Sequence, residues 1–253
     1  MRITVLGKSP SWQDADGACS GYLVEDDGVR VLIDCGNGVF GKLRRFADYL
    51  DVDAALISHL HADHFLDLVP YSYALTYAPR QQQGAPRRPD LHAPTGARAV
   101  FRRVVGAWGD EALIEKAFDL HEYATSDVLR IGPLKIRFQP VPHYTATNAI
   151  EISNGGERMI FGADHRPTDD LNAFATGGDL LLIEATLTEP EAEGPRGHMT
   201  PAEAGEHGRR ANVRRLVLTH ISDELDGEWA RREAEATFGG AVEVACEGAV
   251  YSI

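Results

Sequence analysis

Short apolar runs separated by turn-forming residues recur along the whole chain. Each run is rich in valine, leucine and isoleucine and is bounded by glycine, proline, asparagine or aspartate, which favours a β-strand. Two longer segments, 128–139 and 149–161, each contain a central turn, Gly132-Pro133 and Asn154-Gly155-Gly156, and therefore predict β-hairpins. The other predicted strands cover residues 3–7, 20–25, 29–34, 52–58, 91–94, 179–184, 215–219, 242–245 and 249–252.

Longer segments between these strands have the composition of helices. Helices are predicted over residues 40–50, from about 63 to 77, and over 96–107, 110–118, 200–211 and 228–237. The clearest start is Thr200-Pro201-Ala202-Glu203, a capping box with proline at the first helical position. Strands followed by helices occur in both halves, without an exact repeat or a linker. We therefore predict one domain over residues 1–253, with two sheets flanked by helices.

The composition and net charge of the chain limit the kinds of molecule that such a domain can bind. The chain has 253 residues and a formal net charge of -13, so its acidic surface repels the phosphate backbone of long nucleic acid. A small anionic substrate stays compatible, because bound metal ions would reverse the local charge. The first residues read as a strand and no run of about 18 apolar residues occurs, so neither a signal peptide nor a membrane span is expected.

The cysteines indicate the cellular compartment in which the protein is expected. The chain has 3 cysteines, Cys19, Cys35 and Cys246, and their positions match neither a metal motif nor a disulfide framework. Small buried cysteines in a reducing environment are the simplest interpretation, which predicts a cytoplasmic protein. The sequence leaves the oligomeric state open, and a homodimer is one of the alternatives.

The candidate chemistry begins at His59-Leu60-His61-Ala62-Asp63-His64, directly after the apolar run 52–58. On an extended turn, His59 and His61 point to the same side, and Asp63 and His64 then fall at the start of the following helix. This arrangement suits two adjacent metal ions, because imidazole nitrogen and carboxylate oxygen are ligands that catalytic zinc accepts. A polar surface turn is the alternative, and so dense a group of ligand-type residues after a buried strand argues against it.

Three later apolar strands also end at a ligand-type residue: His143, Asp164 and His220. Taken singly, each of these residues is as well explained by a buried polar group with a hydrogen-bond partner. Side chains at strand ends along one edge of a sheet can converge on a single cleft. Together with the first motif, the three residues therefore predict one completed site.

The motif His59-x-His61-x-Asp63-His64, followed by His143, Asp164 and His220, resembles the metallo-β-lactamase-fold hydrolase superfamily over the whole chain. The resemblance implies an α/β fold, an αββα sandwich of two mixed β-sheets flanked by helices. It also implies two divalent metal ions. By this resemblance one zinc is held by His59, His61 and His143, the second by Asp63, His64 and His220, and Asp164 bridges both. Manganese or iron would also fit these ligands.

Two further stretches, Leu182-Ile183-Glu184-Ala185-Thr186 and Gly197-His198-Met199-Thr200, resemble the ribonuclease Z branch of phosphodiesterases. The resemblance implies that His198 protonates the leaving alkoxide and that Glu184 orients it, so these two residues and Asp63 are the predicted catalytic residues. A positioned acid helps because an alkoxide is a poor leaving group. The alternative is structural, with Glu184 as a strand-end cap and His198 as a helix-start contact.

The chain departs from ribonuclease Z between His143 and Asp164, where that family carries a long arm that grips transfer RNA. Only a tight hairpin fills the gap here. The prediction is therefore a dinuclear metal-dependent phosphodiesterase for a small phosphodiester such as a cyclic nucleotide. Cyclic-nucleotide phosphodiesterases of this fold look similar through Leu6-Gly7, Ser20-Gly21-Tyr22 and Leu66-Asp67-Leu68. The alternatives are a lactonase or other ester hydrolase, a ribonuclease Z-type nuclease, and a non-catalytic binding protein.

One polar segment, residues 79–89, is rich in proline, glutamine and arginine. A solvated loop is the simpler interpretation. The alternative is a mobile lid in which Arg80, Arg87 and Arg88 meet an anionic substrate, and Lys8 is a further candidate for binding phosphate.

Overall fold

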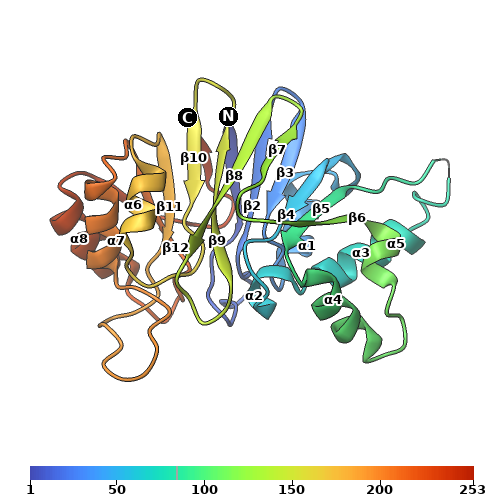
Figure 1. Cartoon of the computed structure of the whole chain (residues 1–253), viewed down its shortest axis with the longest axis horizontal. Helices are drawn as coiled ribbons and strands as arrows, with labels where there is room; N and C mark the ends of the chain where they lie inside the picture. The colour runs from blue at the N-terminus through green and yellow to red at the C-terminus, as the bar shows by residue number, and fades with distance from the viewer. Residues whose placement is uncertain (84) are drawn as a thin grey trace.

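The structure, a computed structural model, describes residues 1–83 and 85–253. It contains two seven-stranded β-sheets that pack face to face, with helices on their outer sides (Figure 1). The first sheet has the order β14-β1-β2-β3-β4-β5-β6. Its strands are β1 (Arg2–Gly7), β2 (Gly21–Asp26), β3 (Val29–Ile33), β4 (Ala54–Leu56), β5 (Asp90–Pro94), β6 (Asp119–Tyr123) and β14 (Val250–Ser252).

The second sheet has the order β13-β12-β11-β10-β9-β8-β7. Its strands are β7 (Val128–Ile131), β8 (Leu134–Val141), β9 (Thr147–Ser153), β10 (Arg158–Phe161), β11 (Leu180–Glu184), β12 (Leu216–Thr219) and β13 (Val242–Val244). Both sheets are mixed, because β3 to β6 run parallel after antiparallel β1 and β2, and β10 to β13 run parallel after antiparallel β7 to β9. The predicted αββα sandwich is thus confirmed.

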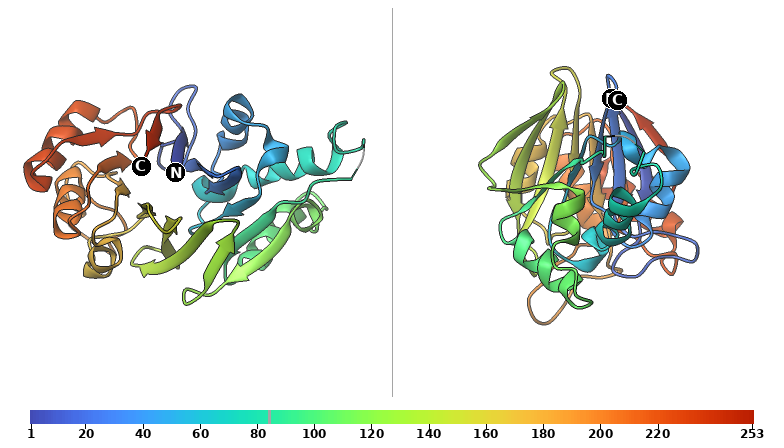
Figure 2. Two further views of the ribbon diagram at one scale, coloured as in Figure 1. Left: turned by 90° about the horizontal axis from the view of Figure 1, so that it is seen from above. Right: turned by 90° about the vertical axis from the view of Figure 1, so that its right-hand side faces the viewer.

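The helices divide between the two outer faces, as the view from above in Figure 2 shows. The first sheet carries α1 (Val39–Phe46), α2 (Ala62–Phe65), α3 (Leu68–Tyr77), α4 (Ala97–Gly106) and α5 (Leu113–Ala117), and the second carries α6 (Asp169–Ala175), α7 (Pro201–Arg210) and α8 (Gly227–Phe238). Alternation along each strand sends one set of side chains between the sheets and the other under the helices. Ile3, Val5 and Ile150 belong to the layer between the sheets. Leu23 and Leu32 of the first sheet belong to the layer under its helices, together with helix residues such as Leu43 and Phe101.

Two of the predicted helices differ from the observed ones. The helix predicted over 40–50 ends at Phe46, and a 3-10 turn follows at Tyr49–Asp51 because the Asp48 side chain accepts from the Leu50 N–H. The helix expected after the histidine turn is split into α2 and α3. At the break, the Asp67 carboxylate accepts from the Phe40 N–H and its own N–H bonds to the Cys35 carbonyl, so this residue ties the chain to α1 instead of continuing α2.

Two elements were not predicted at all. Strand β6 buries only Leu120 and Tyr123 and lies at the edge of its sheet, so its sequence carries too few apolar positions to stand out. Helix α6 is short, although Thr168 caps it by accepting from the Asp170 N–H. The predicted capping box at α7 is confirmed, because the side chains of Thr200 and Glu203 each bond to the other residue's backbone N–H.

The strand directions bring the candidate residues to one edge of the sandwich. In the second sheet β8 and β10 both run antiparallel to β9, and β11 and β12 run parallel to β10, so all four strands end at the same edge. His143 follows β8, Asp164 follows β10, Glu184 ends β11 and His220 follows β12. In the first sheet the turn that begins at His59 follows the carboxyl end of β4.

The 79–89 segment lies at the other end of the parallel strands, because it leads into the start of β5, which runs parallel to β4. In Figure 1 it extends from the right-hand end of the molecule, whereas α2 lies at the lower centre. The Arg80 guanidinium pairs with Asp48 at 2.6 Å, and Arg87 and Arg88 donate to main-chain carbonyls at 3.0 Å or less. The prediction that these arginines form a lid over the substrate is therefore wrong. Gly84, which that prediction included, lies outside the described residues.

Candidate metal centre

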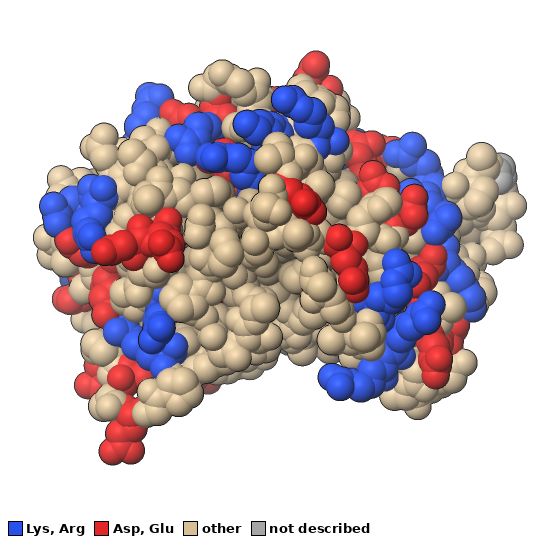
Figure 3. Space-filling view, in the orientation of Figure 1, with Lys and Arg blue, Asp and Glu red and all other residues tan. Residues whose placement is uncertain are grey.

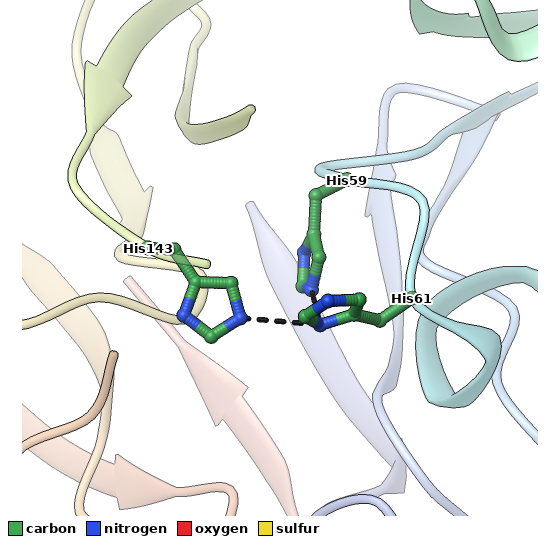
Figure 4. Close-up of side chains that lie close together, drawn as sticks. All are labelled: His59, His61 and His143. Atoms are coloured by element: carbon green, nitrogen blue, oxygen red, sulfur yellow. Dashed lines mark hydrogen bonds between the residues drawn. The ribbon is translucent and has the colours of Figure 1, made fainter. Parts of the chain in front are cut away.

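Three histidines form the first half of the site. The Nε2 atom of His59 lies 3.2 Å from Nδ1 of His61, and the Nε2 atom of His143 lies 3.1 Å from the same Nδ1 (Figure 4). Ligand atoms bound to zinc at about 2.0–2.1 Å and at tetrahedral angles lie about 3.3–3.4 Å apart. These three nitrogens therefore have nearly the spacing of three ligands around one tetrahedral ion.

The second half of the site combines two carboxylates with two histidines. The Nε2 atom of His64 lies 3.4 Å from the Asp63 carboxylate and 3.3 Å from Asp164, and Nε2 of His220 lies 3.3 Å from both carboxylates. The His64 Nε2 is buried and makes no hydrogen bond to a described residue. A buried nitrogen without a hydrogen bond, facing two carboxylates, fits a cation between them.

One oxygen of Asp164 faces both halves. Its Oδ2 lies 3.3 Å from the Nε2 atoms of His64 and His220 and 3.9 Å from those of His59 and His143. A carboxylate oxygen in this position could be shared by two adjacent ions, if two are bound. The structure thus brings together all seven predicted ligand residues, and they divide into the predicted groups: His59, His61 and His143, then Asp63, His64, Asp164 and His220.

The surroundings keep four of these residues, His59, His143, Asp63 and Asp164, in the protonation states that metal binding needs. Burial lowers the pKa of His59 well below its ordinary value and lowers the pKa of His143 to about 4, so both imidazoles are neutral at pH 7. Burial would raise the pKa of Asp63 and Asp164, but the neighbouring imidazoles, chiefly His220 and His64, hold both pKa values below the usual range. The carboxylates are therefore charged.

Asp34, a fully buried carboxylate that was not among the predicted site residues, supports both halves of the site. With Nε2 of His64 facing the ligand cluster, its Nδ1–H donates to Asp34 Oδ2 over 2.7 Å. The two Asp34 oxygens also accept from the Ser58 N–H at 2.8 Å and from the Ser58 hydroxyl at 2.9 Å, and that hydroxyl accepts from His59 Nδ1 at 3.1 Å. Such partners orient ligand histidines and raise their basicity. The sequence feature that could have identified Asp34 is its position directly after the apolar strand 29–33.

The remaining ligand histidines are fixed in the same way. The His143 Nδ1–H donates to the Gly197 carbonyl over 2.8 Å, and the His220 Nδ1–H donates to the Thr186 hydroxyl over 2.8 Å. That hydroxyl in turn donates to Glu184 over 2.8 Å. The roles of Thr186 and of the Gly197 carbonyl were not predicted, although both residues lie in the stretches that identified Glu184 and His198.

Glu184 and His198 form the predicted pair beside the ligands. Nδ1 of His198 lies 3.0 and 3.1 Å from the two oxygens of Glu184, whose side chain is 1% exposed. The His198 ring is stacked at 5.5 Å on the ring of His220 and lies edge-on at 5.0 Å to that of His143. Burial alone would lower the pKa of His198, but the hydrogen bond and charge of Glu184 raise it to about 9.

Glu184 also has the structural contacts that the alternative interpretation expected. Its oxygens accept from the His165 N–H at 2.7 Å and from the Met199 N–H at 3.3 Å, so it joins two loops as well as orienting His198.

Lys8, which was considered for binding phosphate, has partners within the chain. Its ammonium group pairs with Asp14 and donates to the Ile221 carbonyl at 2.8 Å. The suggestion that Lys8 binds a substrate phosphate stays a prediction.

Comparison with known proteins agrees with the fold and the site. The sequence profile of the Beta-lactamase superfamily domain matches residues 29–221, so the chain belongs to this family. An uncharacterized protein of Mycobacterium tuberculosis is 35% identical over 251 residues, which are 98% of this chain and 90% of the relative. The probable metallo-hydrolase YhfI of Bacillus subtilis is 28% identical over 99% of both chains. The chain is accordingly a metallo-hydrolase of the beta-lactamase superfamily.

Solved structures extend the comparison. The crystal structure of YhfI has a TM-score of 0.89 and 26% identity to this chain, covering 99% of this chain and 98% of its own. The short form of human tRNase Z has a TM-score of 0.77 at 20% identity, covering 100% of this chain and 99% of its own, and supports the fold alone. This fold implies divalent metals, and the spacing and charge of the residues described above fit them. Among the described residues, no helix has the length and apolar character needed to cross a membrane.

Proposed function

We propose that the protein is a phosphodiesterase that uses two divalent metal ions and acts on a small phosphodiester such as a cyclic nucleotide. In this proposal one ion is held by His59, His61 and His143, the other by Asp63, His64 and His220, and Asp164 contacts both. Zinc is the expected metal, because nitrogen and carboxylate ligands at tetrahedral spacing suit it. The observation that carries the proposal is the pair of Glu184 and His198 next to both groups of ligands.

The pair supplies what phosphodiester chemistry needs beyond the metals. Bound divalent ions stabilise the charge that develops on the phosphoryl group. An alkoxide leaving group must also be protonated as it departs. Glu184 accepts from His198 Nδ1, so the Nε2–H of the same ring is the proton that can be delivered to the leaving oxygen. The raised pKa of His198, about 9, keeps that proton in place at pH 7.

The size of the expected substrate follows from what surrounds the site. The gap between His143 and Asp164 is occupied by the hairpin of β9 and β10, with no room in the sequence for a long arm. On the face drawn in Figure 3, the centre is largely uncharged, the basic side chains stand near the margins with acidic ones among them, and no continuous basic track crosses the face. Together with the net charge of -13, these features support a small anionic substrate over transfer RNA.

The test is His198→Ala, measured on two substrates. Turnover of a cyclic nucleotide, whose leaving group is a basic alkoxide, should fall by about a hundredfold or more. Turnover of a p-nitrophenyl phosphodiester should change much less, because nitrophenolate leaves without protonation. Metal content by elemental analysis should stay as in the wild type, since His198 binds no metal in this proposal.

The contrast between the substrates separates the proposal from a folding defect. His198→Gln serves as a matched variant, because it keeps a polar side chain of similar size without the acid. Equal loss on both substrates, or loss of metal, would remove His198 from the role of acid. A wild-type protein that hydrolyses a lactone or precursor transfer RNA faster than any small phosphodiester would contradict the proposal itself.

A further inference from the structure

A large aromatic side chain stands exposed at the rim of the site. Tyr144 follows His143 directly and is 47% exposed, although its ring lies only 4.8 Å from the ring of His143 and 5.7 Å from that of His198. It contributes to none of the ligand groups described above. An exposed tyrosine that contacts both a ligand histidine and the proposed acid is placed to meet the substrate.

The position of this ring is fixed from two directions. Its hydroxyl donates to Glu191 Oε1 over 2.5 Å, and the other oxygen of Glu191 accepts from the Gly197 N–H at 3.0 Å. The Cε2–Cζ edge of the ring lies against Gly197, where a Cβ atom would come within 2.2 to 2.4 Å of those two carbons. Gly197 has no left-handed φ, so space for this ring is the reason for glycine here.

A ring held in this way loses little conformational freedom when a second ring stacks on it. Aromatic side chains of this kind bind nucleobases by stacking, since every base has a π-face. His198 lies beside the departing oxygen in the proposed reaction, so the part of the substrate near Tyr144 is the leaving alcohol and what it carries. Arg196 of the same loop pairs with Glu203 of α7, so its guanidinium is not directed at the space beside the Tyr144 ring.

We infer that Tyr144 is a stacking platform for a planar base, and that the substrate is a phosphodiester whose leaving alcohol belongs to a nucleoside. This inference rests on the proposed phosphodiesterase function and narrows its substrate class. A structural role for Tyr144, in which it serves only to hold Glu191 and the loop, is the competing explanation. The two differ in what the ring and the hydroxyl each contribute.

The kinetic test compares a nucleoside 3′,5′-cyclic phosphate with the matching abasic ribose 3′,5′-cyclic phosphate. Tyr144→Ala should raise the KM of the cyclic nucleotide by about tenfold or more and leave kcat within about threefold. The KM of the abasic compound should change by less than about twofold. Tyr144→Phe keeps the ring and loses only the bond to Glu191, so it should resemble the wild type on both substrates.

A binding test distinguishes failure of this inference from failure of the proposed function. Calorimetry on the metal-loaded protein should give tighter binding of a nucleoside 5′-monophosphate than of ribose 5-phosphate, and Tyr144→Ala should remove that difference. Equal binding of the two compounds by the wild type would overturn the inference even if phosphodiesters are cleaved. So would a Tyr144→Phe variant as impaired as Tyr144→Ala, because that result assigns the residue a structural role.

Discussion

Two regions of the chain offer the same kinds of metal ligand in different surroundings. The metal centre at the strand edge and an exposed cluster of Asp90, Asp119 and His121 on β5 and β6 each bring at least three ligand atoms within 4.8 Å of one another. In the exposed cluster, His121 Nε2 lies 3.5 Å from Asp90 and 3.8 Å from Asp119, distances close to those at the centre. Ligand type and spacing therefore do not distinguish the two regions.

The difference lies in burial and support. The side chains of His64, Asp164 and His220 are 0 to 3% exposed, whereas those of the exposed cluster are 49 to 61% exposed. In the centre, the second nitrogens of His59, His64, His143 and His220 all have hydrogen-bond partners in the chain. Among the described residues, no comparable bond orients the side chains of the exposed cluster. Desolvation and orientation, which a list of ligands does not capture, define the site.

One chemical change, aspartate to asparagine, can be made at three places and tests this contrast. The largest effect is expected for Asp164→Asn, because an amide has a single oxygen and no charge and cannot serve both halves of the centre. Loss of at least one metal ion and a fall in phosphodiesterase turnover of more than about a thousandfold are expected. Elemental analysis and a hydrolysis assay measure these two effects. A variant with the full metal content and activity would show that Asp164 is not shared.

A smaller effect is expected for Asp34→Asn, which leaves every proposed ligand in place. The amide cannot accept from His64, the Ser58 N–H and the Ser58 hydroxyl together as the carboxylate does. Loss of such an oriented partner lowers metal affinity by about 10- to 100-fold. Competition with a chelator of known affinity measures this change, and circular dichroism checks that the fold is kept. Unchanged affinity would mean that burial alone, without the Asp34 network, defines the centre.

These surroundings also explain how much of the site the sequence could predict. His143, Asp164 and His220 were found because each is a ligand-type residue directly after an apolar strand, and parallel strands bring such positions to one edge. Asp34 fits the same rule but stands alone, without a histidine nearby in the sequence, so it was passed over. The hydrogen-bond acceptor for the His143 Nδ1–H is the main-chain carbonyl of Gly197, which a motif of side chains cannot predict.

The wrong prediction of a lid over residues 79–89 has a related cause. Arg80 was considered as a contact to substrate because its segment, 79–89, is polar and locally basic. Its carboxylate partner, Asp48, lies 32 positions away in sequence. Pairing at such separations is decided by the tertiary fold, as is the edge position of β6. Periodicity and short motifs predicted the layers and the ligands, and they carry no information about these long-range partners.

The smallest effect is expected for Asp119→Asn in the exposed cluster, where solvent competes for every ligand atom. The change removes a carboxylate that is 61% exposed and lies 3.8 Å from His121, without altering any residue of the metal centre. The number of metal ions per chain and the turnover of a phosphodiester should equal those of the wild type. The free energy of unfolding should change by less than about 0.5 kcal/mol, as is usual for exposed substitutions. Elemental analysis, kinetics and denaturant unfolding provide the three measurements. If the wild type held three ions and this variant held two, exposed ligands without oriented partners would be sufficient to bind a metal ion. Burial and orientation would then no longer distinguish the two regions, and the assignment of the centre depends on that distinction.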